Sequence, residues 1–332
     1  MHTVVSSALL CDSLFPMAEL DVGYHYPVMT KEVGQFVIKR AQECTSEGRK
    51  IAIFDGTLGH GGHVKYFHEL LGDDIGLYVA TDTDIQMFSA ASARLHELLD
   101  PPYLAHTKLY NSTYTDFGVI LDNLKKQDTS VKGYDVLFLD LGVNLWHFKL
   151  PQRGFSIKGD GSLDMRYDAV NNPKTAADIV NTYDEQQLID IFVQNSEITF
   201  ETSKKVAQAI ISFRKNKLFS TTEELNMLIK KIGYSARVAA IVFQAIRIEV
   251  NKEFSNIKYV LENAHTFMNP GGILVILSYH SGEDRIVKEM MKRLQDEQRG
   301  TILTKHTQKP SFHEVSKNKP SRSAQLRVFK YS

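Results

Sequence analysis

Short apolar runs alternate with longer stretches of helical spacing through the first 142 residues of the chain. Runs of aliphatic, β-branched and aromatic residues predict strands over 51–55, 76–82, 104–110 and 136–142. Between them, apolar residues that recur every three or four positions predict helices over 63–72, 84–99 and 115–127. This alternation predicts a parallel sheet with right-handed crossovers, in which ligands bind at the carboxyl ends of the strands.

The alternation breaks at a polar loop over 151–172, after which amphipathic patterns predict helices only, up to one over 253–268. That helix is expected to end at Asn269-Pro270-Gly271-Gly272. Strand character returns at 273–277, a helix follows from about Glu283, and 300–306 and 325–330 are candidates for an antiparallel edge. We therefore expect an α/β fold with a Rossmann-like sheet, built from 23–149 and 249–332, an inserted helical domain over 150–248, and an N-terminal extension over 1–22.

A glycine-rich loop directly follows the first predicted strand and carries Gly56, Gly59, Gly61 and Gly62. Glycine has no Cβ, so a ligand can approach the backbone of such a loop closely. An acid, Asp82, follows the next strand, which is the layout of a nucleoside-cofactor site. The loop lacks the Gly-Lys-Ser/Thr of a phosphate-binding loop, and its spacing is not Gly-x-Gly-x-x-Gly.

Two further acids end predicted strands on either side of this loop. Asp55 precedes the glycines and suits a ligand with a cationic ammonium and sulfonium, which favours S-adenosylmethionine over a nicotinamide cofactor. Asp140 ends the fourth strand and is expected across the sheet from the glycine loop. Carboxylates that only cap turns are the structural alternative for both, and an NAD-dependent oxidoreductase on the same fold is the alternative enzyme.

Charge and cysteine content limit the class of protein. The chain has 39 basic and 39 acidic residues, but the segment from Arg285 onward contains twelve Lys/Arg and only four Asp/Glu. This local excess of positive charge is enough to bind phosphates of a nucleic acid. Two cysteines form no disulfide framework and no Cys/His spacing fits zinc, so we expect a reducing compartment, the cytoplasm, and no metal. No apolar run approaches the length of a membrane span.

Ordered sequence blocks over about residues 24–330 resemble the MraW/RsmH family, the bacterial 16S ribosomal RNA cytosine-N4 methyltransferases. The blocks are His25-Tyr-Pro-Val28, Asp55-Gly-Thr-Leu-Gly59, Gly61-Gly-His63, Asp140-Leu-Gly-Val143, Arg153-Gly-Phe-Ser156, Leu163-Asp-Met-Arg166, Phe243-Gln-Ala-Ile-Arg-Ile248, Val250-Asn251, Ser278-Tyr-His-Ser281, Glu283-Asp-Arg-Ile-Val-Lys288, Ser321-Arg-Ser-Ala324 and Leu326-Arg-Val328.

The resemblance implies a class I methyltransferase that uses S-adenosylmethionine to methylate N4 of a cytosine in the decoding region of 16S ribosomal RNA. Its partner is then small-subunit ribosomal RNA or the 30S particle. The Asn/Asp-Pro-Pro-Tyr/Phe motif of DNA amine methyltransferases is absent, so DNA is not expected. The oligomeric state stays open, a homodimer included. The implied cofactor contacts are Gly61, Gly62, His63, Asp82, Tyr114, Asp140 and His147, and Asp140 is our candidate catalytic residue, as acceptor for the amine N–H.

The chain departs from the family pattern at positions that bear on function. Asn144-Leu-Trp-His147 replaces Ser-Ser-x-Gln, and Tyr279-His-Ser-Gly282 replaces Phe-His-Ser-Leu. The first departure leaves a non-catalytic RNA-binding or ribosome-assembly factor as an alternative. Asp164 and Arg166 are expected to form a structural ion pair, and His280 is either an active-site group or a strand-end histidine. Candidates for RNA contact are Trp146 and Phe155 by stacking, and Arg153, Arg166, Arg247, Arg285, Lys288, Arg322 and Arg327 on phosphates.

Overall fold

A computed structural model describes residues 27–332, and the predicted extension over 1–22 lies outside this range. Its centre is a seven-stranded sheet of order β3-β2-β1-β4-β5-β7-β6. The first five strands in this order are parallel, and β7 runs antiparallel to both β5 and β6. The strands are β1 (Ile51–Asp55), β2 (Ile75–Asp82), β3 (Thr107–Asn111), β4 (Tyr134–Asp140), β5 (Met268–Ser278), β6 (Gly300–Ile302) and β7 (Gln325–Tyr331).

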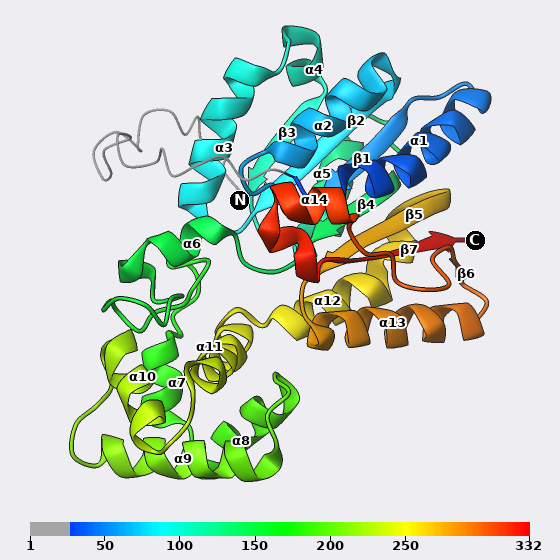
Figure 1. Cartoon of the computed structure of the whole chain (residues 1–332). Helices are drawn as coiled ribbons and strands as arrows, with labels where there is room; N and C mark the ends of the chain where they lie inside the picture. Colours follow the sequence, from blue (N-terminus) through cyan, green and yellow to red (C-terminus); the bar gives the residue numbers. More distant parts are fainter. Residues whose placement is uncertain (1–26) are drawn as a thin grey trace.

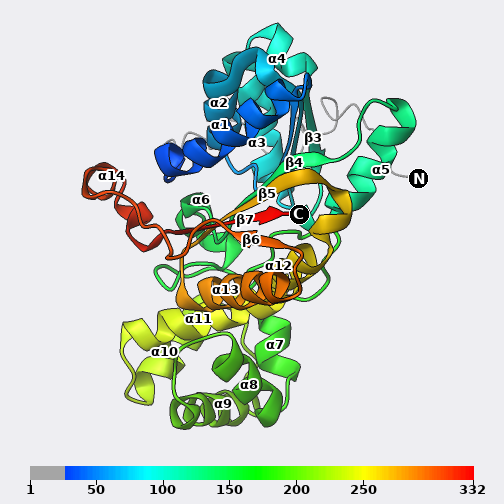
Figure 2. The same ribbon diagram turned by 90° about the vertical axis from the view of Figure 1, so that its right-hand side faces the viewer.

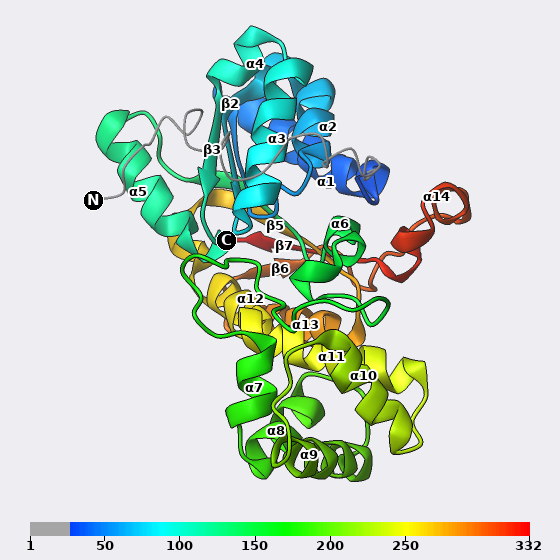
Figure 3. The ribbon, with the colours of Figure 1, turned by 90° about the vertical axis from the view of Figure 1, so that its left-hand side faces the viewer.

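Helices cover both faces of the sheet (Figure 1). One face carries α1 (Thr30–Ser46), α2 (Gly62–Leu71), α3 (Ile85–Leu98) and the short α4 (Pro101–Ala105). The other carries α5 (Phe117–Gln127), α12 (Glu253–Asn263) and α13 (Ser281–Asp296). A short α6 (Leu145–Lys149) follows β4, and α14 (Phe312–Lys317) lies on an arm that projects from the sheet domain in both side views (Figures 2 and 3).

The alternation of side chains along the central strands explains this two-sided packing. In β1, Ile53 packs into the core beneath α1 and α2, while its neighbour Phe54 packs into the core beneath α5 and α13. In β4, Phe138 and Leu137 divide between the two cores in the same way. Successive side chains of a strand point to opposite faces, so a central strand covered on both faces is apolar throughout.

A separate helical unit is inserted between β4 and α12. It contains α7 (Ala176–Thr182), α8 (Glu185–Gln194), α9 (Phe200–Arg214), α10 (Thr222–Lys231) and α11 (Ala236–Asn251). Its side chains form a third apolar core of their own, which includes Phe192, Ile210 and Phe243. The unit lies below the sheet domain in Figures 1–3, and α11 leads directly back into α12.

The predicted α/β sheet of Rossmann type with its helical insertion is confirmed, whereas several boundaries were wrong. The strand predicted over 104–110 begins only at Thr107, because Asp100-Pro101-Pro102 starts α4; proline favours the first helical turn. The helix predicted over 253–268 ends at Asn263, and β6 is shorter than 300–306. The pattern analysis missed α1, α4, α6 and α14 entirely. No helix within residues 27–332 is long and apolar enough to span a membrane.

Candidate active site

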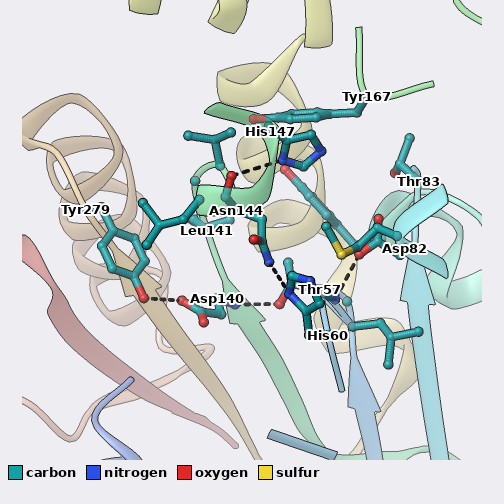
Figure 4. A pocket seen from close by; sticks show the side chains of 18 of the residues that line it. Thr57, His60, Asp82, Thr83, Asp140, Leu141, Asn144, His147, Tyr167 and Tyr279 are labelled. Carbon is teal, nitrogen blue, oxygen red and sulfur yellow. Dashed lines mark hydrogen bonds between the residues drawn. The ribbon is translucent and has the colours of Figure 1, made fainter. Parts of the chain in front are cut away.

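A cavity of about 350 Å³ opens at the carboxyl ends of β1, β2 and β4, as predicted for a parallel sheet. Its volume falls in the range of small-molecule sites, about 300–1,000 Å³. One part of the wall comes from the loops that follow these three strands, and the opposite part from Tyr167, Gln244 and Arg247 of the inserted region. Figure 4 shows side chains from both parts pointing into the same space.

The glycine loop is folded tightly against its neighbours. A Cβ on Gly56 would lie 2.4 Å from Leu139 and 2.6 Å from Tyr114, so only glycine fits there. Gly59 has a φ of +52°, a left-handed backbone conformation that residues other than glycine rarely adopt. The Leu58 amide donates to the carbonyl of Thr81, which ties the loop to β2. The loop therefore brings its backbone close to the cavity, beside the side chains of Thr57 and His60 (Figure 4).

Asp55 supports this loop from below and does not line the cavity, which corrects the expectation that it faces a cationic ligand. It is fully buried, and its carboxylate accepts hydrogen bonds from the Thr57 amide at 3.0 Å and from the Tyr78 hydroxyl at 3.1 Å. Burial raises its pKa to about 6. Its position at the end of β1 was predicted, but its side chain points into the domain.

Asp82 lies at the cavity wall with its carboxylate already fixed by backbone donors. Its two oxygens accept from the Gly59 amide and from the Asp84 amide, each at 2.9 Å. Burial, and secondarily the nearby Asp84 carboxylate, raises the pKa of Asp82 to about 7 despite these two donors. The remaining lone pairs of the carboxylate can accept hydroxyl groups of a ligand.

Asp140 lies at the end of β4, across the cavity from Asp82. Its Oδ1 accepts a 2.6 Å hydrogen bond from the Tyr279 hydroxyl, and its backbone amide donates to Thr57 Oγ1 at 2.7 Å (Figure 4). His63 Nδ1 lies 3.6 Å from Oδ2. Burial raises the pKa of Asp140 to about 7, although the Tyr279 hydrogen bond acts in the opposite direction. A carboxylate tuned to this range is suited to proton transfer near neutral pH.

Six of the seven implied cofactor contacts line this one cavity. Gly62, His63, Asp82, Tyr114, Asp140 and His147 all belong to its wall. Gly61 does not: it precedes α2, its amide donates to the carbonyl of Leu58, and a Cβ there would meet Leu95 at 3.0 Å. Gly61 therefore shapes the loop from behind.

His147, which replaces the glutamine of the family pattern, is held by the protein itself. Its Nε2 lies 2.9 Å from Asp84 Oδ2, and its Nδ1 lies 3.2 Å from the Asn144 carbonyl. Arg153 Nη2 donates to the same Asp84 oxygen at 2.6 Å and to the Arg166 carbonyl at 2.9 Å. This network connects the start of α3 to the loop that leads into the helical unit.

Most of the residues predicted to contact RNA are engaged inside the protein. Trp146 and Phe155 are 3% and 5% exposed, so the prediction that they stack on RNA bases was wrong for the described conformation. Four of the predicted phosphate-binding arginines form ion pairs: Arg153 with Asp84, Arg166 with Asp164, Arg247 with Glu253, and Arg327 with Asp284. The structural Asp164–Arg166 pair was predicted. Arg285, Lys288 and Arg322 are exposed and make no ion pair with another residue of 27–332.

The sequence analysis missed three cavity residues that come from distant segments, Tyr167, Gln244 and Tyr279. The only signal for Tyr279 was its departure from the phenylalanine of the family pattern. His280 lines the cavity and also caps α13, where its ring accepts from the Glu283 amide at 3.4 Å; its role as an active-site group stays a prediction.

Within the described residues, one cluster has the composition of a metal site, formed by Glu253, His280 and Glu283. Arg247 donates two hydrogen bonds to the Glu253 carboxylate, at 2.8 and 2.9 Å. Glu283 in turn accepts from the Tyr279 amide at 2.8 Å and lies 3.1 Å from His280 Nε2. Because these carboxylates already have partners, we assign the cluster a structural role between α11, α12 and α13.

Comparison with known proteins identifies the family of this chain. Residues 23–332 match the model of the MraW methylase family. The chain is 36% identical to a ribosomal RNA small subunit methyltransferase H of Elusimicrobium minutum, over 92% of this chain and 97% of that protein. Proteins of the same name from Coprothermobacter proteolyticus and Sulfurihydrogenibium are 34% and 36% identical, over 92% of this chain and 95% and 98% of theirs. The chain therefore belongs to the MraW methylase family.

Proposed function

We propose that this chain transfers a methyl group from S-adenosylmethionine to the exocyclic N4 amine of a cytosine in the decoding region of 16S ribosomal RNA. The observation that carries the proposal is Asp140, a half-buried carboxylate at the wall of the cavity opposite Asp82, with its pKa raised to about 7. Full-length relatives named as small-subunit ribosomal RNA methyltransferases support the substrate class.

The residues around the glycine loop fit S-adenosylmethionine. Asp82 offers acceptor oxygens for the ribose hydroxyls, Tyr114 offers an aromatic face for adenine, and the start of α2 at Gly62 offers backbone donors for a carboxylate. When bound, the cofactor supplies an electrophilic methyl group on a sulfonium. Gly56 and Gly59 have no Cβ, so a ligand of this size can come close to the backbone of the loop at the strand ends.

The work left to the protein is to make a poor nucleophile react. The lone pair of an exocyclic cytosine amine is delocalised into the ring, so the enzyme must orient the amine and take up its proton. Asp140 supplies an acceptor at the end of β4, where Thr57 fixes its backbone and Tyr279 its side chain. Tyr167 and Gln244 line the opposite wall of the cavity.

We place the RNA across the cavity mouth, between the helical unit and the basic C-terminal part of the chain. Arg322 is two residues from Pro320, which lines the cavity, and Arg285 and Lys288 lie in the N-terminal half of α13, the helix that begins directly after His280 of the cavity wall. Exposed cations at the edge of an active site are suited to hold phosphates of a substrate strand.

Replacing Arg285, Lys288 and Arg322 together with glutamine should weaken binding of ribosomal RNA without affecting S-adenosylmethionine. The logarithm of the binding constant falls linearly with the logarithm of the salt concentration, and each phosphate contact contributes roughly 0.7–0.9 to the steepness of this fall. Loss of up to three contacts should therefore make the dependence shallower by about 2–3. Filter binding from 50 to 300 mM KCl measures this slope. The matched control replaces Lys125, Lys126 and Lys132, three cations at the opposite, amino-terminal edge of the sheet. An unchanged slope in the first triple variant places the RNA elsewhere.

The proposed reaction is tested by incubating the protein with labelled S-adenosylmethionine and small-subunit particles that lack the modification. Mass spectrometry of digested RNA should then show N4-methylcytosine at a single site. Calorimetry with S-adenosylmethionine and NADH separates the methyltransferase from the oxidoreductase alternative. Binding of S-adenosylmethionine and RNA with no methyl transfer would instead identify a non-catalytic assembly factor.

A further inference from the structure

The carboxylate of Asp140 is flanked by side chains from two different elements, one on each oxygen. Tyr279, which follows β5, donates to Oδ1 at 2.6 Å, and His63, in the first turn of α2, approaches Oδ2 with Nδ1 at 3.6 Å. All three residues line the cavity.

The second nitrogen of His63 determines which way this arrangement can carry a proton. Nε2 lies 3.1 Å from the backbone carbonyl of Val28, and a carbonyl oxygen only accepts hydrogen bonds. Nε2 therefore carries the hydrogen, and in the neutral ring Nδ1 has a lone pair that faces Asp140 Oδ2. A proton that arrives on Oδ2 has an acceptor directly beside it.

We propose that Tyr279 and His63 are positioning residues for Asp140: Tyr279 holds Oδ1 and keeps the carboxylate ionised, while His63 takes over from Oδ2 the proton that the substrate amine releases. This inference rests on the proposed function. The amine nitrogen forms a bond to the methyl carbon as the carbon–sulfur bond breaks and its electron pair stays on sulfur. The nitrogen then loses a proton to Oδ2, and Oδ2 passes it to Nδ1. The separation of 3.6 Å is slightly longer than a hydrogen bond, and catalytic contacts of this kind often tighten when substrate binds.

The sign of the expected pH effect follows from the groups that face Asp140. Burial, and secondarily the carboxylates of Asp55 and Glu283, disfavour its charge, whereas the Tyr279 hydroxyl favours the charge. Only the ionised carboxylate accepts a proton, so activity falls as pH drops through the pKa of Asp140. Without the hydroxyl this pKa rises, and the acid limb of the pH profile moves to higher pH. A shift of about one pH unit is typical for one strong hydrogen bond to a carboxylate.

Tyr279→Phe tests the role of the Tyr279 hydroxyl, because the substitution removes this one oxygen atom and keeps the ring. The acid limb of kcat should move up by about one pH unit, with kcat reduced about tenfold at pH 6 and changed little at pH 9. Tyr259→Phe, an exposed tyrosine on α12, is the matched control. Independently of activity, the ¹³Cγ signal of Asp140 in aspartate-labelled protein, identified by its loss in Asp140→Asn, should titrate at higher pH in Tyr279→Phe. An unchanged titration overturns the role of Tyr279.

His63→Asn tests proton transfer from Asp140 to His63, because asparagine is polar at the same place but takes up no proton. We expect kcat to fall at least tenfold at all pH values, while the Kd for S-adenosylmethionine changes less than threefold in calorimetry. The opposite result, weaker binding of S-adenosylmethionine with an unchanged kcat at saturation, would make His63 a cofactor contact only. It would overturn the proposed proton transfer from Asp140 to His63. Should the wild-type protein transfer no methyl group while the Asp140 signal still shifts in Tyr279→Phe, the proposed function fails and the hydrogen bond stands.

Discussion

Replacing Asp140 with alanine should lower the rate of methyl transfer by about 10²–10⁴-fold, the usual contribution of a positioned acid or base. The variant loses the only side-chain acceptor that β4 contributes to the cavity, and the amine then keeps its proton and is held less firmly. The measurement is single-turnover transfer of a labelled methyl group to small-subunit particles at pH 8, with S-adenosylmethionine at saturation.

Two further variants make this result specific. Asp140→Asn keeps an acceptor oxygen but takes up no proton, so a loss close to that of alanine assigns Asp140 to proton transfer, and a much smaller loss assigns it to orientation alone. Asp73→Ala removes an exposed aspartate near the end of α2 and should leave the rate unchanged. Near-normal turnover in Asp140→Ala would exclude the residue from the chemistry.

The sheet and the position of its ligand site were predictable because both depend on local sequence. Central strands buried on two faces have to be apolar throughout, and the strands end where Asp55, Asp82 and Asp140 begin the loops. Glycine spacing located the loop for the same reason, since a Cβ on Gly56 would overlap its neighbours. These constraints act over a few residues and leave a visible pattern.

Side-chain roles were harder to predict because they depend on partners that are distant in sequence. Arg153 and Asp84 are 69 positions apart, and Arg327 and Asp284 are 43 apart, yet each pair is within 2.7 Å. An arginine in a loop is identical in sequence whether it binds a phosphate or a carboxylate of its own chain. Trp146 was misread for a related reason, because only the folded loop shows that it is buried.

The network around Asp84 has a consequence for how the two parts of the molecule share one cavity. Through Arg153, the start of α3 is linked to the backbone of Arg166, and Asn251 at the end of α11 accepts from the amide of Tyr167 at 2.8 Å. The peptide group between Arg166 and Tyr167 is therefore held from both sides, by Arg153, which pairs with Asp84 of the sheet domain, and by Asn251 of the helical unit. A loop held in this way presents a preformed wall, which lowers the entropic cost of ordering it when a ligand binds.

Replacing Asp82 with alanine should weaken binding of S-adenosylmethionine by about 10- to 100-fold, because hydrogen bonds to a charged group contribute roughly 1.5–3 kcal/mol. The carboxylate has two functions here: it accepts from the Gly59 amide, which fixes the glycine loop, and it leaves lone pairs for ribose hydroxyls. Asp82→Asn keeps one acceptor oxygen and should give an intermediate Kd. Asp74→Ala, which removes an exposed aspartate directly before the same strand, should bind like the wild type. Calorimetry at pH 8 measures all four proteins, and thermal unfolding shows whether each is folded. A wild-type Kd in folded Asp82→Ala would move the ribose to another part of the cavity.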